Sequence, residues 1–417
     1  MRTVRSLPDH HRARRPRLIV PLLLAFACGA ATACAGPAGS PAQQQFPVQP
    51  SPAAQASPAA QADGAAQAGP ATQAGTAAQA SPPAQAGTAA AETAEASQAA
   101  VAGTTVPGAP GCPMFPADNI WNTDISQLPV NSRSAAWMRS MHSARRFLHP
   151  DFGPNPGGYP YGISFNVVTS GHRLVRIKFR YASDSNKGPY PFGPGIRIEG
   201  GKNAGGDRHA IMVNKDTCTL YELWLARYSP TGSTAGSGAI WKLTSNALRP
   251  AGKTSADAAG LPILPGLLNY SQVRAAVRSG TPITHAIRFT VQRTRSAFIW
   301  PARHEAGSGG SKNLPPMGAR FRLKASFSIA RFCSNARSPF CKAAKVVLTE
   351  MRHYGMIVAD NGSNWFFQGS AFPRWPDGLV SLLKLIPARA FEAVNESCLM
   401  VSRNSGQATA KPACPIG

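Results

Sequence analysis

The chain has 417 residues, of which 43% are hydrophobic and 15% are charged, and its formal net charge is +24. Its amino-terminal quarter is too poor in large apolar residues to fold, so the foldable part is about Gly111–Gly417, which is long enough to bury a core. The basic excess favours an anionic partner, such as nucleic acid, a membrane face or an acidic polymer, and the alternative that stays open is a solvated basic surface without a partner.

Residues 1–34 have the order of an export signal: six arginines, then the apolar run Leu18–Ala27, then small residues. The apolar run is too short to span a bilayer comfortably, so we predict no permanent transmembrane helix. Ala31-Thr32-Ala33-Cys34 is similar to a lipoprotein cleavage box, although Ala31 stands where such boxes carry leucine. Attachment to a membrane through a lipid on Cys34 is therefore left open. Export argues against nucleic acid as the partner, and no zinc-finger spacing or RNP-type motif argues for it.

Residues 35–111 are dominated by Ala, Gln, Pro, Gly, Ser and Thr, and a glutamine recurs every six residues from Gln55 to Gln85. A hexapeptide period can indicate a β-helix, but such coils need a large apolar residue in every turn. We predict a disordered tether here and a single β-rich domain over residues 112–417.

Six cysteines remain after the signal region, and an even number in an exported chain predicts disulfides. Cys333 and Cys341 bracket a short loop and are a natural pair, and Cys398–Cys414 is a second prediction. Six cysteines allow about fifteen connectivities, so the full pattern stays open. The chain has no CxxC, which argues against a thiolate metal site.

Helical spacing is confined to short stretches of the domain. Helices are predicted at Ser134–Ser143, Ser271–Arg278, Lys342–Tyr354 and Asp377–Ile386. The third ends before Gly355, where a helix favours a left-handed residue.

Most other periodic stretches alternate as strands do. They are Ile163–Val168, Leu174–Tyr181, Ala239–Leu243, Ile283–Val291, Ala297–Trp300, Ala319–Phe327 and Phe391–Val394. Two hairpins are predicted, one around Asn214-Lys215-Asp216 and one in which Asn361-Gly362 joins Met356–Ala359 to Trp365–Gln368. Many short strands and few helices favour a mainly β fold, an antiparallel sandwich of jelly-roll or lectin-like type with a few peripheral helices.

Several runs in the domain resemble those of an uncharacterised family of secreted bacterial proteins. They include GDRHAIMV, TCTLYELW, HAIRFTV, WPARH, LPPMGARFRLKASF and YGMIVADNGSNWFFQG. The resemblance would cover most of Phe115–Val394. It implies no activity, so no catalytic residue follows from it.

The stretch Gly195–Ala226 stands out because an acid-poor chain places four carboxylates there, including Glu199, Asp207 and Glu222. Glycoside cleavage needs one carboxyl group as acid and a second as base or nucleophile. The candidates are Glu199, Asp207, Glu222, Asp257 and Asp360. The alternative for each is an ion pair with one of the many arginines, and for Asp360 a turn that bonds its own backbone.

Two histidines open apolar strands in the same tripeptide, His209-Ala210-Ile211 and His285-Ala286-Ile287. They could lie at one rim and act in acid–base chemistry, or they could simply bond backbone carbonyls. With His304 and His353 they could hold a metal, but the spacing matches no metal-binding pattern, so we expect no metal and no cofactor.

A lyase would need a base and a charge neutraliser that act on a uronate-like sugar. A histidine with a neighbouring arginine fits that need, and tryptophans could stack on sugar rings or simply fill the core. The residues expected to bind substrate are Arg208, Arg288, Trp300, Arg303, His304 and Trp365.

The prediction is a secreted or surface-tethered protein that acts on an acidic polysaccharide as a hydrolase or lyase. Its catalytic residues are expected among Glu199, Asp207, His209, Glu222, His285 and Asp360. The alternative is a module that only binds an anionic wall polymer through Arg and Trp. A monomer is the working expectation.

Overall fold

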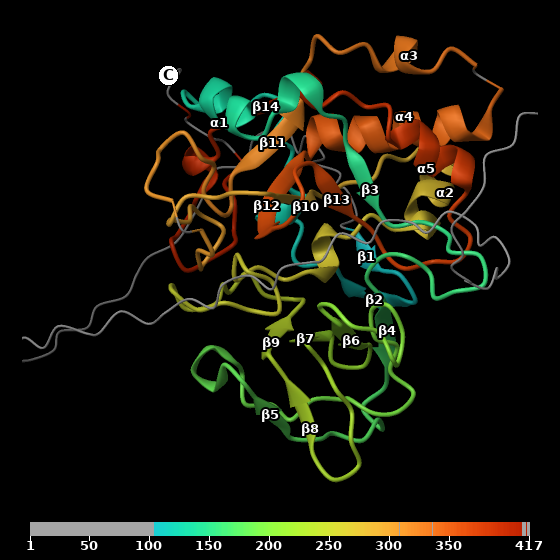
Figure 1. Cartoon of the computed structure of the whole chain (residues 1–417), viewed down its shortest axis with the longest axis vertical. Coiled ribbons are helices and arrows are strands. Elements are labelled where there is room, and N and C mark those ends of the chain that lie inside the picture. The colour runs from blue at the N-terminus through green and yellow to red at the C-terminus, as the bar shows by residue number, and fades with distance from the viewer. Residues whose placement is uncertain (1–103, 308, 336, 411–413, 415–417) are drawn as a thin grey trace, which may run out of the picture. The chain divides into compact units, whose positions relative to one another are not determined.

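Mixed β-sheets make up most of the fold, with few helices around them (Figure 1). The computed structural model describes residues 104–307, 309–335, 337–410 and 414, so the predicted export signal and most of the predicted tether lie outside the described residues. The fold begins earlier than the expected boundary at Cys112, with a hairpin of β1 (Thr105–Val106) and β2 (Ala109–Pro113). Val106 and Ala109 are buried, and this burial holds the hairpin on the domain.

The larger sheet has six strands in the order β14-β11-β12-β10-β13-β3. Their bounds are β3 (His149–Asp151), β10 (Ile287–Val291), β11 (Arg320–Leu323), β12 (Met356–Asn361), β13 (Phe366–Gln368) and β14 (Phe391–Ala393). Every residue of β10 is buried, as expected for a strand with neighbours on both edges and packing on both faces.

The hairpin predicted at Asn361-Gly362 is wrong, because β10 lies between β12 and β13. β12 pairs with β10 in parallel, and β13 pairs with the other edge of β10 antiparallel. The turn after β12 therefore carries the chain across the end of β10. Local turn chemistry gave no information about this third strand, which comes from far earlier in the chain.

The smaller sheet has the order β4-β6-β7-β9. Its strands are β4 (Phe165–Val168), β6 (Ala210–Asn214), β7 (Thr219–Trp224) and β9 (Ser237–Lys242), and a separate pair joins β5 (Ile177–Phe179) to β8 (Ser233–Ala235). β6 and β7 form the predicted hairpin. Side chains alternate across a strand, so Ile211 and Val213 enter the main core while Ala210 and Met212 enter a second, smaller core.

The expectation of antiparallel sheets is wrong for several pairs among the described residues. β10–β12, β13–β3, β4–β6 and β5–β8 all run parallel. Parallel neighbours need a long connection, and the path from β10 to β12 supplies one through β11 and the longest helix. The segment predicted as a strand at Ala297–Trp300 makes only a single bridge, from Phe298 to Met317.

The four predicted helices are present. The described helices are α1 (Ser134–Ser140), α2 (Tyr270–Ser279), α3 (Ile329–Phe332), α4 (Pro339–His353) and α5 (Asp377–Leu383). α4 begins where Ser338 accepts a hydrogen bond from Cys341 N, and Gly355 follows it with φ 66°, as predicted. Within the described ranges, no helix is long and apolar enough to cross a membrane.

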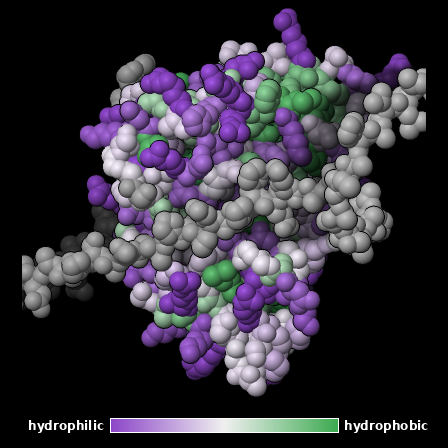
Figure 2. Space-filling view, viewed as in Figure 1, coloured by the Kyte–Doolittle hydropathy of each residue, from purple (hydrophilic) through white to green (hydrophobic). Residues whose placement is uncertain are grey.

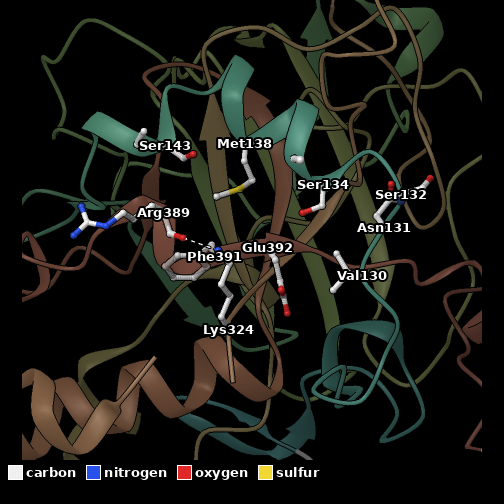
Figure 3. A pocket seen from close by; sticks show the side chains of 12 residues that line it. Val130, Asn131, Ser132, Ser134, Met138, Ser143, Lys324, Arg389, Phe391 and Glu392 are labelled. Carbon is white, nitrogen blue, oxygen red and sulfur yellow. Dashed lines mark hydrogen bonds between the residues drawn. The ribbon is translucent and has the colours of Figure 1, made fainter. Parts of the chain in front are cut away.

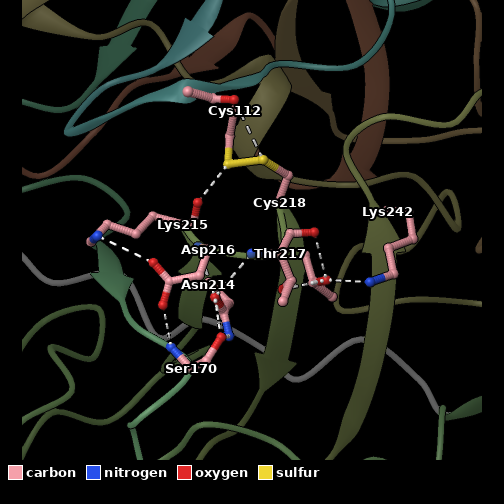
Figure 4. The surroundings of a disulfide bond; sticks show 10 residues. Cys112, Ser170, Asn214, Lys215, Asp216, Thr217, Cys218 and Lys242 are labelled. Carbon is pink, nitrogen blue, oxygen red and sulfur yellow. Dashed lines mark hydrogen bonds and ion pairs between the residues drawn. A yellow bond between two sulfur atoms is a disulfide. The ribbon is translucent and has the colours of Figure 1, made fainter.

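Three disulfides join Cys112 to Cys218, Cys333 to Cys341 and Cys398 to Cys414. The last two pairs confirm the sequence prediction. The first ties β2 to the segment that precedes β7, beside the turn of the β6–β7 hairpin (Figure 4). Disulfides are compatible with an extracellular protein.

Candidate functional site

Glu199 and His209 form an ion pair at the start of β6. The Oε2 atom of Glu199 accepts from His209 Nδ1 at 2.6 Å and from His209 N at 3.2 Å, and Glu199 N donates to His209 O at 2.9 Å. His209 Nε2 faces Ala256 O at 3.1 Å, so both ring nitrogens meet acceptors. The His209 side chain is 5% exposed, whereas that of Glu199 is 28% exposed, which leaves the carboxylate in contact with water.

The pKa of His209 reflects these neighbours. Burial lowers it, but the charge and hydrogen bond of Glu199, with the charge of Asp207, outweigh burial and raise the pKa to about 9. His209 is therefore an imidazolium at neutral pH. Its role is to hold Glu199 in place, and it is not available there as a base.

The glycine-rich loop between Glu199 and Asp207 is held by Arg208. This residue has a left-handed φ of 48°, is buried, and donates to Ala226 O at 3.1 Å, Lys202 O at 3.2 Å and Ala204 O at 2.5 Å. The adjacent Asp207 is exposed and accepts from Trp224 Nε1 at 3.0 Å. Arg208 thus shapes the loop that presents Asp207, and it does not present its own charge to a ligand.

A chain of polar groups links three strands of the larger sheet to the loop that carries Asp257. Arg288 of β10 donates from Nε and Nη2 to the two carboxylate oxygens of Asp257, at 3.2 and 2.7 Å, and from Nη1 to Gln368 Oε1 at 2.5 Å. Gln368 Nε2 then donates to Asp151 Oδ2 at 3.1 Å, and Tyr161 donates to Asp151 Oδ1. The chain ends at Tyr161, which is 46% exposed.

Asp151 is the carboxyl group that this network presents beside Glu199. It is half-buried at the end of β3. Burial raises the pKa of Asp151, the hydrogen bonds from Tyr161 and Gln368 lower it, and the nearby charge of Glu199 raises it, with a net shift upward. Asp151 therefore keeps its proton to a higher pH than an ordinary aspartate, and it lies within electrostatic reach of Glu199, which is paired with a cation.

Asp360, at the end of β12, lies on the other side of the Arg288–Asp257 pair. It is half-buried and accepts from its neighbour Asn361 N at 2.7 Å, as the turn interpretation expected. Burial first, then the charges of Asp257 and Asp207, raise its pKa to about 7, although Arg288 acts in the opposite direction. The structure thus brings Glu199, Asp207, His209 and Asp360 together around Arg288.

Sequence reasoning missed Asp151, Tyr161 and Gln368. Residues 149–160 are rich in Gly and Pro, which is typical of a loop, yet His149–Asp151 pairs with β13. No local pattern marked Asp151, because the pairing of β3 with β13 brings it to the site.

The other predicted residues lie away from this site or inside the protein. Glu222 is 0% exposed, and its carboxylate accepts from Ile263 N and Leu264 N at 2.9 to 3.0 Å, which anchors a loop. His285 is buried against Ala286 O, Gln272 and Glu350, in the other sheet from His209, so the two histidines share no rim.

The residues expected to bind substrate have partners within the protein. Arg288, Arg303 and Trp365 are at most 5% exposed. Arg303 donates hydrogen bonds to Arg249 O, Arg403 O and Asn404 Oδ1. The indole nitrogens of Trp300 and Trp365 donate to Ser405 O and Met141 O. His304 Nδ1 faces Ala258 O. The binding alternative therefore cannot rest on these arginines and on Trp365.

A hollow of about 450 Å³ lies elsewhere, between α1 and β14 (Figure 3). Two of its charged lining residues have partners, since Lys324 Nζ donates to Arg389 O at 2.9 Å and Glu392 accepts from Arg322 at 3.0 Å. None of the predicted site residues lines it. We therefore place the candidate site at the carboxyl cluster, where the titratable groups converge.

The described residues contain no group of three or more His, Cys, Asp or Glu side chains placed to hold a metal ion. No protein-family model matches the chain, and no curated protein or solved structure is significantly similar to it. The site has therefore to be interpreted from its own chemistry.

Proposed function

We propose that the protein hydrolyses an acidic polysaccharide of the cell envelope or the extracellular space. One observation carries the proposal: Asp151, which accepts hydrogen bonds from Tyr161 and Gln368 and whose pKa burial raises, lies within electrostatic reach of Glu199, which is paired with a charged histidine. Glycoside hydrolysis requires one carboxylic acid and one carboxylate, and enzymes set these two states by placing the groups in different environments.

In the proposed reaction, Asp151 gives its proton to the oxygen that leaves when the glycosidic carbon–oxygen bond breaks. Glu199 accepts a proton from the attacking water, and the remaining hydroxide forms the new bond to the sugar carbon. His209 positions Glu199. Asp360, whose pKa is also raised, is the alternative acid.

The site favours hydrolysis over elimination. The lyase interpretation assigned the base to a histidine, but the pKa of about 9 keeps His209 protonated at neutral pH. It also needs a cation free to neutralise the sugar carboxylate, and Arg288 is buried and already bound to Asp257 and Gln368.

The proposal places the protein outside the cytoplasm, secreted or held at the outer face of the cell membrane by a lipid on Cys34. The arginine-rich, apolar start of the chain and the three disulfides support this location. We also propose that the two larger sheets pack as in a lectin-like sandwich.

The test is release of reducing ends from carboxylated and neutral polysaccharides by the purified full chain. Glu199→Gln should lower kcat about 100-fold or more, because it removes the base while keeping the shape of the side chain. Asp151→Asn and Asp360→Asn should separate the two candidate acids, since only one of them should lower kcat by that amount.

The matched control is Asp216→Asn, which neutralises an exposed carboxylate in the β6–β7 turn. It should leave the rate within about twofold. Undiminished release of reducing ends by Glu199→Gln would exclude this site, and release of unsaturated sugars, detected by their ultraviolet absorbance, would replace hydrolysis with elimination.

A further inference from the structure

A row of unpaired cations lies on β5 and its flanks. Ile177 is buried, whereas the alternating side chains of Arg176, Lys178 and Arg180 are exposed. None of these three forms an ion pair with another described residue. β5 belongs to the outlying β5–β8 pair, far from the helices that cover the larger sheet (Figure 1), and hydrophilic side chains are prominent on this part of the surface (Figure 2).

An aromatic pair adjoins this row. Arg180 N and Tyr181 N donate to Ala235 O and Gly236 O, at 3.0 and 2.9 Å, and this pairing places Tyr181 against Trp224. Their ring centroids are 6.1 Å apart with planes inclined by 27°, and the Arg180 guanidinium lies 5.3 Å from the Tyr181 centroid. Both rings are half-buried, so part of each meets solvent.

Gly236 makes the aromatic pair possible. A Cβ atom there would lie 2.2 Å from Trp224 Cε3, and Gly236 N donates to Trp224 O at 2.7 Å. Only a residue without a side chain lets the backbone lie flat against the indole. The fold therefore holds this tryptophan in one orientation.

Asp207 connects the aromatic pair to the candidate site. It accepts from Trp224 Nε1 at 3.0 Å, and its backbone carbonyl accepts from Leu225 N at 2.8 Å. The same carboxylate is one of the charges that act on His209. The aromatic pair and the Glu199–His209 pair thus lie on two sides of one residue.

We propose that Arg176, Lys178, Arg180, Tyr181 and Trp224 form a binding surface for a carboxylated polysaccharide, adjacent to the Glu199–His209 pair. Carboxylates along such a polymer match the unpaired cations, and the aromatic rings pack against the apolar faces of sugar rings. The inference rests on the proposed function for its choice of a polysaccharide. It assigns polymer binding to Arg176, Lys178 and Arg180, which form no ion pair with another described residue, and not to the buried arginines Arg208, Arg288 and Arg303.

The test measures binding of the full chain to polygalacturonate, to neutral dextran and to single-stranded DNA at low and high salt. The key variant is the triple charge reversal Arg176→Glu, Lys178→Glu and Arg180→Glu, whose exposed side chains can change without loss of the fold. A second variant, Tyr181→Ala, removes the ring. The control reverses three exposed arginines elsewhere: Arg139→Glu, Arg146→Glu and Arg278→Glu.

The β5 reversal should weaken polygalacturonate binding about tenfold or more, and the control reversal at most about twofold, because a local surface and not net charge binds the polymer. Tyr181→Ala should weaken binding less, and added salt should weaken it strongly. Equal losses in both reversals, equal binding of dextran, or tighter binding of DNA would each overturn the inference.

Binding and cleavage fail separately in this design. If polygalacturonate binds at the β5 surface but no polysaccharide is cut, the binding surface stands and the proposed hydrolysis falls. If the protein releases reducing ends, Glu199→Gln abolishes this release, and the β5 reversal leaves polymer binding unchanged, the proposed hydrolysis is supported and the proposed binding surface is wrong.

Discussion

Arg288 donates two hydrogen bonds to Asp257, at 3.2 and 2.7 Å, in an ion pair whose two residues are each 1% exposed. Arg288 comes from β10 and Asp257 from the loop after β9, so the pair fixes this loop to the larger sheet. It also orients Gln368 and, through it, Asp151. The ion pair is thus a support for the candidate site.

Removal of one partner should be costly. Asp257→Ala leaves the Arg288 charge buried without a counter-ion, and the free energy of unfolding should fall by about 3–5 kcal/mol. Urea unfolding checks this value. Lys215→Ala is the control, because its ion pair with Asp216 is 47% and 40% exposed, so solvent screens it and its loss should change the free energy of unfolding little. Similar losses in the two variants would contradict the assignment.

The pH dependence of hydrolysis should follow Asp151. This group must be protonated to act as the acid, so the rate should fall as pH rises through its raised pKa. The hydrogen bond from Tyr161 lowers that pKa. Tyr161→Phe should therefore move the alkaline limb of the kcat/KM profile to higher pH, whereas Tyr270→Phe, on α2, should not move it. A limb that moves to lower pH would exclude Asp151 as the acid.

The stability that comes from His209 should depend on pH in a defined direction. Its folded pKa, about 9, exceeds the ordinary value of 6.5, so its contribution is complete below about pH 6.5 and is lost as pH rises through about 9. The contribution is at most about 3 kcal/mol. Urea unfolding at about pH 6 should separate the wild type from His209→Gln, and at about pH 10 the difference should shrink. A difference that grows with pH would contradict the ion pair.

Of the disulfides, Cys112–Cys218 should stabilise the fold most, because it closes a separation of 106 residues, against 8 for Cys333–Cys341. The entropy of loop closure predicts about 5 kcal/mol for the long loop and about 2.5 kcal/mol for the short one. Thermal unfolding of the two Cys→Ser double variants tests this order, and a larger loss for the short loop would reverse it.

Local patterns predicted the parts of the fold that depend on local interactions. The helix over Lys342–Tyr354, its glycine end at Gly355 and the β6–β7 hairpin all follow from neighbours in sequence. The Asn361-Gly362 turn misled because its flanking strands pair with β10, which lies far away in the chain. Strand order depends on such distant partners, and a single sequence does not show them.

In the candidate site, too, residues close together in the sequence could be predicted and those brought in by distant strand pairing could not. Glu199, Asp207 and His209 could be found because they share one short stretch of an acid-poor chain. Asp151 could not, because only the pairing of β3 with β13 brings it there. The arginines were misassigned because an exposed arginine and a buried one look alike in a sequence. The difference depends on Asp257 and on backbone carbonyls that the fold supplies.

The position of β10 has a consequence for how the chain becomes native. Both edges of β10 pair with strands that lie more than sixty residues further along the chain, β12 and β13. The edge strand β3 can join the sheet only after β13 is in place. Contacts that span such lengths form slowly. A growing or truncated chain that stops before β12 would leave β10, a fully buried strand of the fold, without its neighbours. We therefore expect such fragments to aggregate and the last third of the chain to limit the rate of folding.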